Sequence, residues 1–115
     1  MYHMVNPSER PAGALAAVAF EGERYGAGVS YFRGELPPGK GPGLHRHPYP
    51  ETCIVLAGRA EMVVDGERLV ASAGDTVVIA TGTPHAFVAI GDEPLAMVAV
   101  HASDRIVIEW LSEQH

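Results

Sequence analysis

Gly39-Lys-Gly-Pro-Gly-Leu-His45-Arg-His47-Pro-Tyr-Pro-Glu51 is the stretch that carries the strongest structural signal in this chain. His45 and His47 are two residues apart, so on an extended segment both side chains point to one face. Each proline biases the residue before it toward extended geometry, and along an extended path Glu51 falls on the same face. The stretch therefore predicts a strand-like path that aims two imidazoles and a carboxylate at a common point.

A histidine far downstream completes a candidate metal site. His85 follows a Thr-Pro pair and opens another predicted strand, so it can reach the same point from a neighbouring strand. Three imidazoles and one carboxylate suit a borderline divalent transition ion, and this donor set does not distinguish Fe, Mn, Ni, Co, Cu or Zn. We expect one such ion per chain, held by His45, His47, Glu51 and His85.

The coordination number bears on function. Four protein ligands on a six-coordinate ion leave two positions for water, dioxygen or a chelating substrate. On tetrahedral zinc the same four ligands would close the site.

Short apolar stretches make up most of the remaining sequence. Thirteen glycines and nine prolines separate them, and stretches of this length favour strands over amphipathic helices. The Asp65-Gly66 pair is a strong signal for a type I′ hairpin turn. Many short, evenly spaced strands predict an all-β barrel or a double-sheet jelly roll. The expected strands are Ala14–Phe20, for which a helix is the alternative, Gly28–Leu36, Thr52–Ala57, Ala60–Val64, Arg68–Ala71, Thr76–Ile79, His85–Ile90, Leu95–His101 and Ile106–Leu111.

Size and charge narrow the class of protein. A chain of 115 residues is one domain, and we expect a flexible segment over 1–11 and a single β-barrel domain over 12–115. The net charge of −6 without a basic cluster argues against nucleic acid or an anionic membrane as the main partner. The single cysteine cannot form an internal disulfide, and no stretch is long enough to span a bilayer, so a cytoplasmic protein is the default expectation.

Two motifs in the chain resemble those of the cupin superfamily. Its first motif is a glycine, five residues, His-x-His, three or four residues, Glu, six residues and a glycine; the matching positions here are Gly39, His45, His47, Glu51 and Gly58. Its second motif is matched at Gly74, Gly82 and His85, whereas Ala80 replaces a proline and Ala89 an asparagine. Neither departure removes a ligand, but the loss of the asparagine puts a polar pocket contact in doubt.

The resemblance implies a cupin-type double-stranded β-helix, which is a small jelly-roll barrel. Such barrels are often dimeric, with the ion inside and a pocket opening at one end. The superfamily includes dioxygenases, isomerases, epimerases, decarboxylases, storage proteins and sensor domains, so fold membership does not settle the reaction.

Strand parity identifies candidate pocket residues. Cys53 and Val55 share the parity of Glu51, and Phe87 and Ala89 share that of His85, so a mostly apolar pocket beyond the metal is expected. The alternative is that these residues simply fill the barrel. For Cys53 we favour a small buried hydrophobe over a thiol that takes part in chemistry.

Five other residues have roles that parity leaves open. Tyr49, between two prolines, can lie at the pocket mouth, where it is a weak candidate for a catalytic proton donor, or it can equally be a packing residue. Tyr31 and Arg33 share one face of their strand, opposite the phenylalanine between them, and parity does not choose which face lines the interior, although a solvated outer arginine is favoured. His101 is expected to be structural or a hydrogen-bond partner, and Trp110 to be part of the core or of a dimer contact.

Two functions remain in competition. The first is a metal-dependent enzyme, of dioxygenase or isomerase type, acting on a small oxygen-chelating organic substrate. The second is a non-catalytic small-molecule-binding or sensor protein in which the metal is structural or recognises the ligand. Because open sheet edges invite pairing, we also expect a homodimer that covers the Ala14–Phe20 and Trp110 segments.

Overall fold

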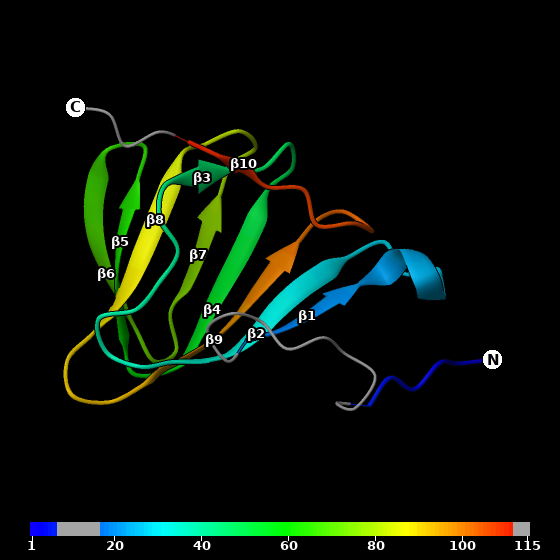
Figure 1. The fold of residues 1–115 in the computed structure, drawn as a ribbon, viewed down its shortest axis with the longest axis horizontal. Coiled ribbons are helices and arrows are strands. Elements are labelled where there is room, and N and C mark those ends of the chain that lie inside the picture. Colours follow the sequence, from blue (N-terminus) through cyan, green and yellow to red (C-terminus); the bar gives the residue numbers. More distant parts are fainter. Residues whose placement is uncertain (7–16, 112–115) are drawn as a thin grey trace.

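Two five-stranded antiparallel sheets form the molecule (Figure 1). In the computed structural model the described residues are 1–6 and 17–111. One sheet, called sheet A here, has the strand order β1 (Ala17–Glu21), β2 (Ser30–Leu36), β9 (Leu95–His101), β4 (Glu51–Ala57) and β7 (Thr76–Ile79). The other, sheet B, has the order β10 (Glu109–Trp110), β3 (His45–Arg46), β8 (His85–Ile90), β5 (Arg59–Val64) and β6 (Glu67–Ser72). The architecture is the predicted all-β jelly roll.

Most of the predicted strands are present. Those predicted over Thr76–Ile79, His85–Ile90 and Leu95–His101 have the predicted bounds. The prediction for Ile106–Leu111 was too long, because β10 pairs only with the two-residue β3, through Glu109 with Arg46 and Trp110 with His45. Of the first predicted strand, the part from residue 17 is β1, and residues 14–16 lie outside the described part.

Glycines make two of the turns possible. Asp65 and Gly66 join β5 to β6 with φ angles of 52° and 80°, as a type I′ turn requires. Gly58 joins β4 to β5 with a φ of 76°, and a Cβ built on it would lie 2.4 Å from the carbonyl oxygen of Pro94. A side chain at residue 58 would therefore meet backbone as well as an unfavourable φ.

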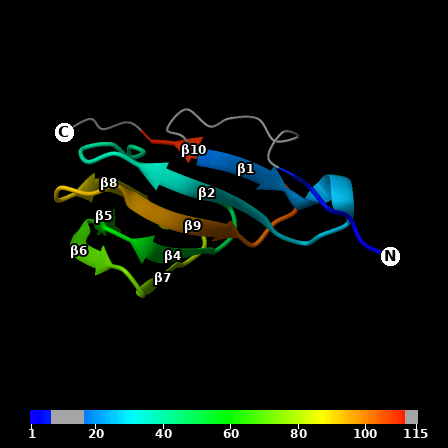
Figure 2. The same cartoon turned by 90° about the horizontal axis from the view of Figure 1, so that it is seen from below.

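The interior of the sandwich divides into two regions that we name the filled half and the open half. In the filled half, β4 and β7 face β5 and β6, and their inward side chains are almost fully buried: Cys53, Val55, Ala60, Met62, Ala71 and Ile79. The open half lies between β2 and β9 on one side and β3, β8 and β10 on the other. Figures 1 and 2 show β1 and β2 at the end of the molecule away from β5 and β6.

Helix is nearly absent from the described residues. They contain one short 3₁₀ helix, Gly22–Tyr25, which lies between β1 and β2 in the sequence. No helix in the described part of the chain is long and apolar enough to cross a membrane.

Candidate metal centre

The predicted ligands come together where the two sheets meet at one end. In sheet B, His45 of β3 pairs with His85, the first residue of β8. In sheet A, Glu51 is the first residue of β4, and His47 lies in the connection that leads to it. One donor atom from each of the four residues lies within 4.8 Å of the other three, and all four side chains are buried.

The segment from His45 to Glu51 has the alternation that its sequence predicts. Residues 45, 47, 49 and 51 are buried, whereas Pro48 and Pro50 between them are exposed. The prolines keep this connection out of helical geometry, so successive odd residues turn to the interior.

Each of the three cluster histidines is oriented by a backbone carbonyl. The Nδ1–H of His45 donates to the carbonyl oxygen of Gly43 at 2.7 Å, that of His47 to Val107 at 2.8 Å, and that of His85 to Thr83 at 2.8 Å. With the proton held on Nδ1, the lone pair of Nε2 faces the cluster. This is the arrangement by which proteins fix the tautomer of a metal-binding histidine.

The carboxylate of Glu51 lies among these nitrogens. Its Oε1 is 3.0 Å from Nε2 of His47 and 2.9 Å from Nε2 of His85. Burial opposes ionisation of this group, but the close contacts with the rings of His47 and His85 outweigh burial and hold the pKa of Glu51 well below its usual range. The site therefore keeps a negative charge at neutral pH.

Three further observations test the fit to a metal ion. Nε2 of His47 is buried and has no hydrogen-bond partner of acceptable geometry, although Glu51 is close. Burial lowers the pKa of His45, which keeps that ring neutral. For His85, burial also lowers the pKa, but the contact with Glu51 outweighs it and the net pKa is raised, as expected where a proton occupies a cation position. Three imidazoles, one carboxylate and an unsatisfied buried nitrogen fit a divalent transition ion.

A fourth histidine lies beside the cluster but has different partners. His101 ends β9 opposite Glu51 in the sheet, and its Nε2 is 3.7 Å from Oε2 of Glu51. Its Nδ1 lies 2.6 Å from the hydroxyl of Tyr49. Burial lowers the pKa of His101 to about 4. Sequence reasoning expected this residue to be structural or a hydrogen-bond partner, and the contact with Tyr49 agrees with the second alternative. Its place beside the cluster was missed, although it shares the inward parity of Met97 and Ala99 on its strand.

Tyr49 does not lie at the pocket mouth, contrary to the sequence-based prediction. Its parity with His47 turns the ring inward, where it stacks on the His47 ring with centroids 5.2 Å apart. The hydroxyl contacts His101 and both backbone groups of Val107, and the side chain does not line the pocket. Burial raises the pKa of Tyr49, which further disfavours it as a proton donor to a ligand.

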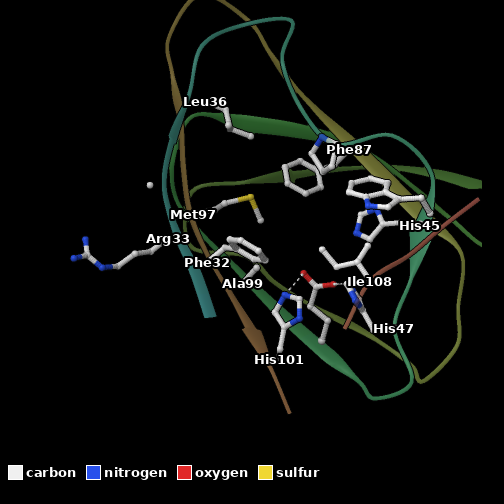
Figure 3. A pocket seen from close by; sticks show the side chains of 14 residues that line it. Phe32, Arg33, Leu36, His45, His47, Phe87, Met97, Ala99, His101 and Ile108 are labelled. Atoms are coloured by element: carbon white, nitrogen blue, oxygen red, sulfur yellow. Dashed lines mark ion pairs between the residues drawn. The ribbon is translucent and has the colours of Figure 1, made fainter. Parts of the chain in front are cut away.

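A pocket of about 240 Å³ opens beside the cluster, in the open half (Figure 3). His45, His47, Glu51 and His101 form its polar wall. The other wall is apolar and consists of Phe32, Leu36, Pro42, Phe87, Met97, Ala99, Ile108 and Trp110. Such a pocket suits a small organic ligand with one polar end.

Parity predicted the inward direction of the pocket candidates correctly but not their surroundings. Phe87 lines the pocket. Cys53, Val55 and Ala89 do not, and they are core residues no more than 1% exposed. Cys53 and Val55 lie on β4, where the facing strands are those of the filled half, and this is why they meet packed side chains and not the pocket. Burial raises the pKa of the Cys53 thiol, and its Sγ lies 3.5 Å from Oε2 of Glu51.

The mouth of the pocket is formed by residues whose roles parity left open. Phe32 of β2 faces inward, and Figure 3 shows the side chain of Arg33 pointing away from the pocket, as favoured for a solvated arginine. Tyr31 stacks on Phe20, with ring centroids 4.9 Å apart. Trp110 is 61% exposed, so it is not part of the core, and a dimer contact stays a prediction. Its ring lies 5.1 Å from that of His45. Its place at the mouth follows from the pairing of β10 with β3.

Comparison with known proteins now identifies the family. The profile of the family described as the Cupin domain matches residues 32–101, more than half of the chain. The chain is a cupin. Among curated protein sequences, none matches this cupin.

Solved structures show the same fold. A conserved protein of unknown function from Streptococcus pyogenes is 28% identical with a TM-score of 0.61, over 67% of this chain and 66% of that one. The formate complex of Lactobacillus farciminis oxalate decarboxylase is 23% identical with a TM-score of 0.79, over 90% of this chain and 34% of that one. Bacillus subtilis oxalate decarboxylase, which has Mn(II) centres, is 23% identical with a TM-score of 0.75, over 88% of this chain and 29% of that one. This cupin therefore spans about a third of the length of the decarboxylases it resembles.

Proposed function

We propose that this cupin binds one divalent transition ion through His45, His47, Glu51 and His85 and acts on a small organic molecule that chelates the ion through oxygen atoms. The observation that carries the proposal is the convergence of three carbonyl-oriented histidines and an ionised glutamate at the polar end of an otherwise apolar pocket. A bound ion of this kind supplies Lewis acidity, and iron or manganese also supplies redox chemistry. The Mn(II) centres of the B. subtilis decarboxylase support including manganese in the tests.

The pocket wall indicates which part of a ligand lies away from the ion. Apart from His101, Gly34 and Arg33, the lining residues that are not metal ligands are aromatic or aliphatic, and Arg33 points away from the pocket. A dianion such as oxalate, which chelates through one oxygen of each carboxylate, would leave its two outer charged oxygens against apolar side chains, which is unfavourable. An enol, catechol or hydroxy-ketone with an apolar body suits the pocket better.

The residues around the pocket favour metal-centred chemistry over general acid–base chemistry. Tyr49 is turned away from the pocket, and Cys53 remains a protonated core thiol. An enzyme built this way is of dioxygenase or isomerase type, because those reactions draw mainly on the ion. The alternative is a sensor or binding protein in which the same pocket recognises a metabolite without turnover.

Metal analysis followed by a ligand screen tests the proposal. The wild-type protein should bind one cobalt(II), iron(II) or manganese(II) ion per chain, and His47→Ala should lose most of that metal while His3→Ala, an exposed histidine outside the cluster, keeps it. Chelators with an apolar body should then change the cobalt spectrum, whereas oxalate serves as the mismatched probe. Oxygen uptake or product analysis with each binder separates the two functions. Full metal retention in His47→Ala would overturn the metal assignment.

We also propose that the protein is a homodimer. The outer face of sheet A carries an apolar surface, in which Val78 and Val100 flank Thr52, and Val100 pairs with Tyr31. Val78 is 67% exposed, so an apolar surface of this kind favours association with a second copy. Sedimentation at roughly tens of micromolar should give a dimer for the wild type and a monomer for Val78→Asp. A monomeric wild type at that concentration would contradict this assembly.

A further inference from the structure

His101 presents a different nitrogen to the pocket from the one that its neighbours present. The three cluster histidines place Nδ1–H on backbone carbonyls, which leaves an Nε2 lone pair for the ion. His101 contacts no carbonyl in this way; its Nδ1 faces a hydroxyl at 2.6 Å, and its Nε2 faces a carboxylate oxygen at 3.7 Å. The position of the proton on the His101 ring therefore depends on the Tyr49 hydroxyl and the Glu51 carboxylate.

The hydroxyl of Tyr49 decides where that proton lies. The hydroxyl oxygen accepts the backbone N–H of Val107 at 3.0 Å, so its own proton is available to one acceptor. The carbonyl oxygen of Val107, at 3.2 Å, already accepts Nδ1–H of His47 at 2.8 Å. Nδ1 of His101 is the nearer acceptor and has no other donor among the described contacts. Tyr49 thus donates to Nδ1, and the single proton of neutral His101 is on Nε2.

The carboxylate of Glu51 gives the same assignment independently. Its Oε2 faces Nε2 of His101, and a carboxylate is stabilised by an N–H on that side but repelled by a ring lone pair. Nε2 of His101 is therefore a donor at the polar wall of the pocket, next to the donor atoms of the cluster. Its lack of a lone pair there also distinguishes it from a fifth metal ligand.

We propose that His101 is a ligand-recognition residue, whose Nε2–H donates a hydrogen bond to an anionic oxygen of the chelating molecule, and that Tyr49 is the positioning residue that fixes this tautomer. This inference rests on the proposed function, because it assigns the ligand an anionic oxygen beside the ion. The rest of the wall around His101 is apolar, with Phe32 5.5 Å from its ring and Ala99 on the same strand. The ligand class that results is a monoanionic enolate or phenolate with an apolar body.

The tautomer is measurable before any ligand is added. In ¹⁵N-labelled, zinc-loaded protein, long-range ¹H–¹⁵N spectra should show His101 protonated at Nε2 and His45, His47 and His85 protonated at Nδ1. Tyr49→Phe removes the hydroxyl proton and should move at least part of the His101 population to the Nδ1–H form. A purely structural role of Tyr49 would leave the His101 nitrogen shifts unchanged, and an Nδ1–H form in the wild type would overturn the inference.

Ligand binding tests the recognition role. The probe is maltol, a small hydroxy-ketone chelator, titrated into the cobalt-loaded protein. His101→Phe should keep its cobalt but bind maltol about tenfold to a hundredfold more weakly, because a hydrogen bond to a charged group is lost. His101→Gln, which retains an N–H donor, should recover part of the affinity and covers the case in which His101→Phe does not fold.

The outcomes separate this inference from the function on which it rests. Loss of cobalt from both His101 variants would make His101 a metal ligand and overturn the recognition role. Unchanged maltol affinity in a folded His101→Phe would also overturn that role while leaving the proposed function intact. Failure of the wild type to bind maltol and the other chelators of the screen would overturn both.

Discussion

In the filled half, β4 and β7 face β5 and β6, and the side chains of Val55, Met62 and Ile79 between them are almost fully buried. In the open half, β2 and β9 meet β8 and β10 around a pocket of about 240 Å³. Both halves use the same two sheets and the same inward parity. The open half differs because β3 and β10, which form part of one of its walls, are only two residues long. One half therefore provides stability, and the other provides the site.

Replacing one methionine in each half tests this comparison and should give the largest change in the free energy of unfolding. Met62 is fully buried in the filled half, whereas Met97 lines the pocket. Met62→Ala should lower the free energy of unfolding by about 2–5 kcal/mol, because it creates a cavity in a packed core. Met97→Ala should cost clearly less, because it enlarges a space that already exists. Chemical denaturation of the metal-free variants measures both, and equal losses would mean that the halves do not differ in packing.

Metal binding should stabilise the open half without any change in packing. At a free ion concentration of about 100 times Kd, an ion that binds only the folded state adds about 2.7 kcal/mol, which corresponds to a rise in Tm on the order of 10 °C. Thermal unfolding of wild type and His47→Ala with and without cobalt(II) measures it. A Tm rise in His47→Ala equal to that of the wild type would place the ion elsewhere.

The same rise in Tm should grow with pH above about 6.5. The raised pKa of His85 stabilises the metal-free fold below its ordinary value of 6.5 and loses that contribution as pH rises through the folded pKa. Over the same range the proton leaves the nitrogen that the ion needs, so binding strengthens. The metal-induced Tm rise should therefore be larger at pH 8 than at pH 6.5. A rise that shrinks with pH would show that His85 does not compete with the ion for a proton.

These two halves also show how far the sequence could be interpreted. The ligands His45, His47 and Glu51 lie within one short segment, so strand geometry and two prolines were enough to place them on one face. His85 followed from its place at the start of another predicted strand, and the turn at Asp65 and Gly66 followed from local backbone preference. The architecture and most strand bounds were predictable for the same reason, since each depends on residues near in sequence.

The pocket wall was not predictable, because it depends on which strands face one another. Parity gives Cys53 and Phe87 the same inward direction, but Cys53 faces the packed side of the sandwich and Phe87 faces the pocket. Trp110 reaches the mouth only through the pairing of β10 with β3, across more than 60 residues of sequence. His101 likewise becomes part of the site through pairing with Glu51 and contact with Tyr49.

Matched alanines sharpen the contrast by adding volume to each half. Ala60→Leu overpacks a fully buried position of the filled half and should lower stability by about 1–3 kcal/mol. Ala99→Leu projects into the pocket, so it should cost less stability but weaken binding of maltol to the cobalt-loaded protein. Denaturation and spectral titration of both variants check the pair. Undiminished maltol affinity in Ala99→Leu would mean that the ligand does not extend along β9.

Cys53 lies at the border of the two halves and should show the smallest effect. Its Sγ is fully buried and donates weakly to Oε2 of Glu51 at 3.5 Å, and burial keeps it a thiol by raising its pKa. Cys53→Ser places a hydroxyl at the same position, which should cost about 1–2 kcal/mol and leave cobalt content unchanged. Cys53→Ala is the control for lost volume without a polar group. If the thiol belonged to the metal site, the cobalt-loaded wild type would show a sulfur-to-metal charge-transfer band that both variants lack. Its absence in the wild type is the expected result, because the three nitrogens and the Glu51 carboxylate already supply the donor set while Cys53 packs against the core.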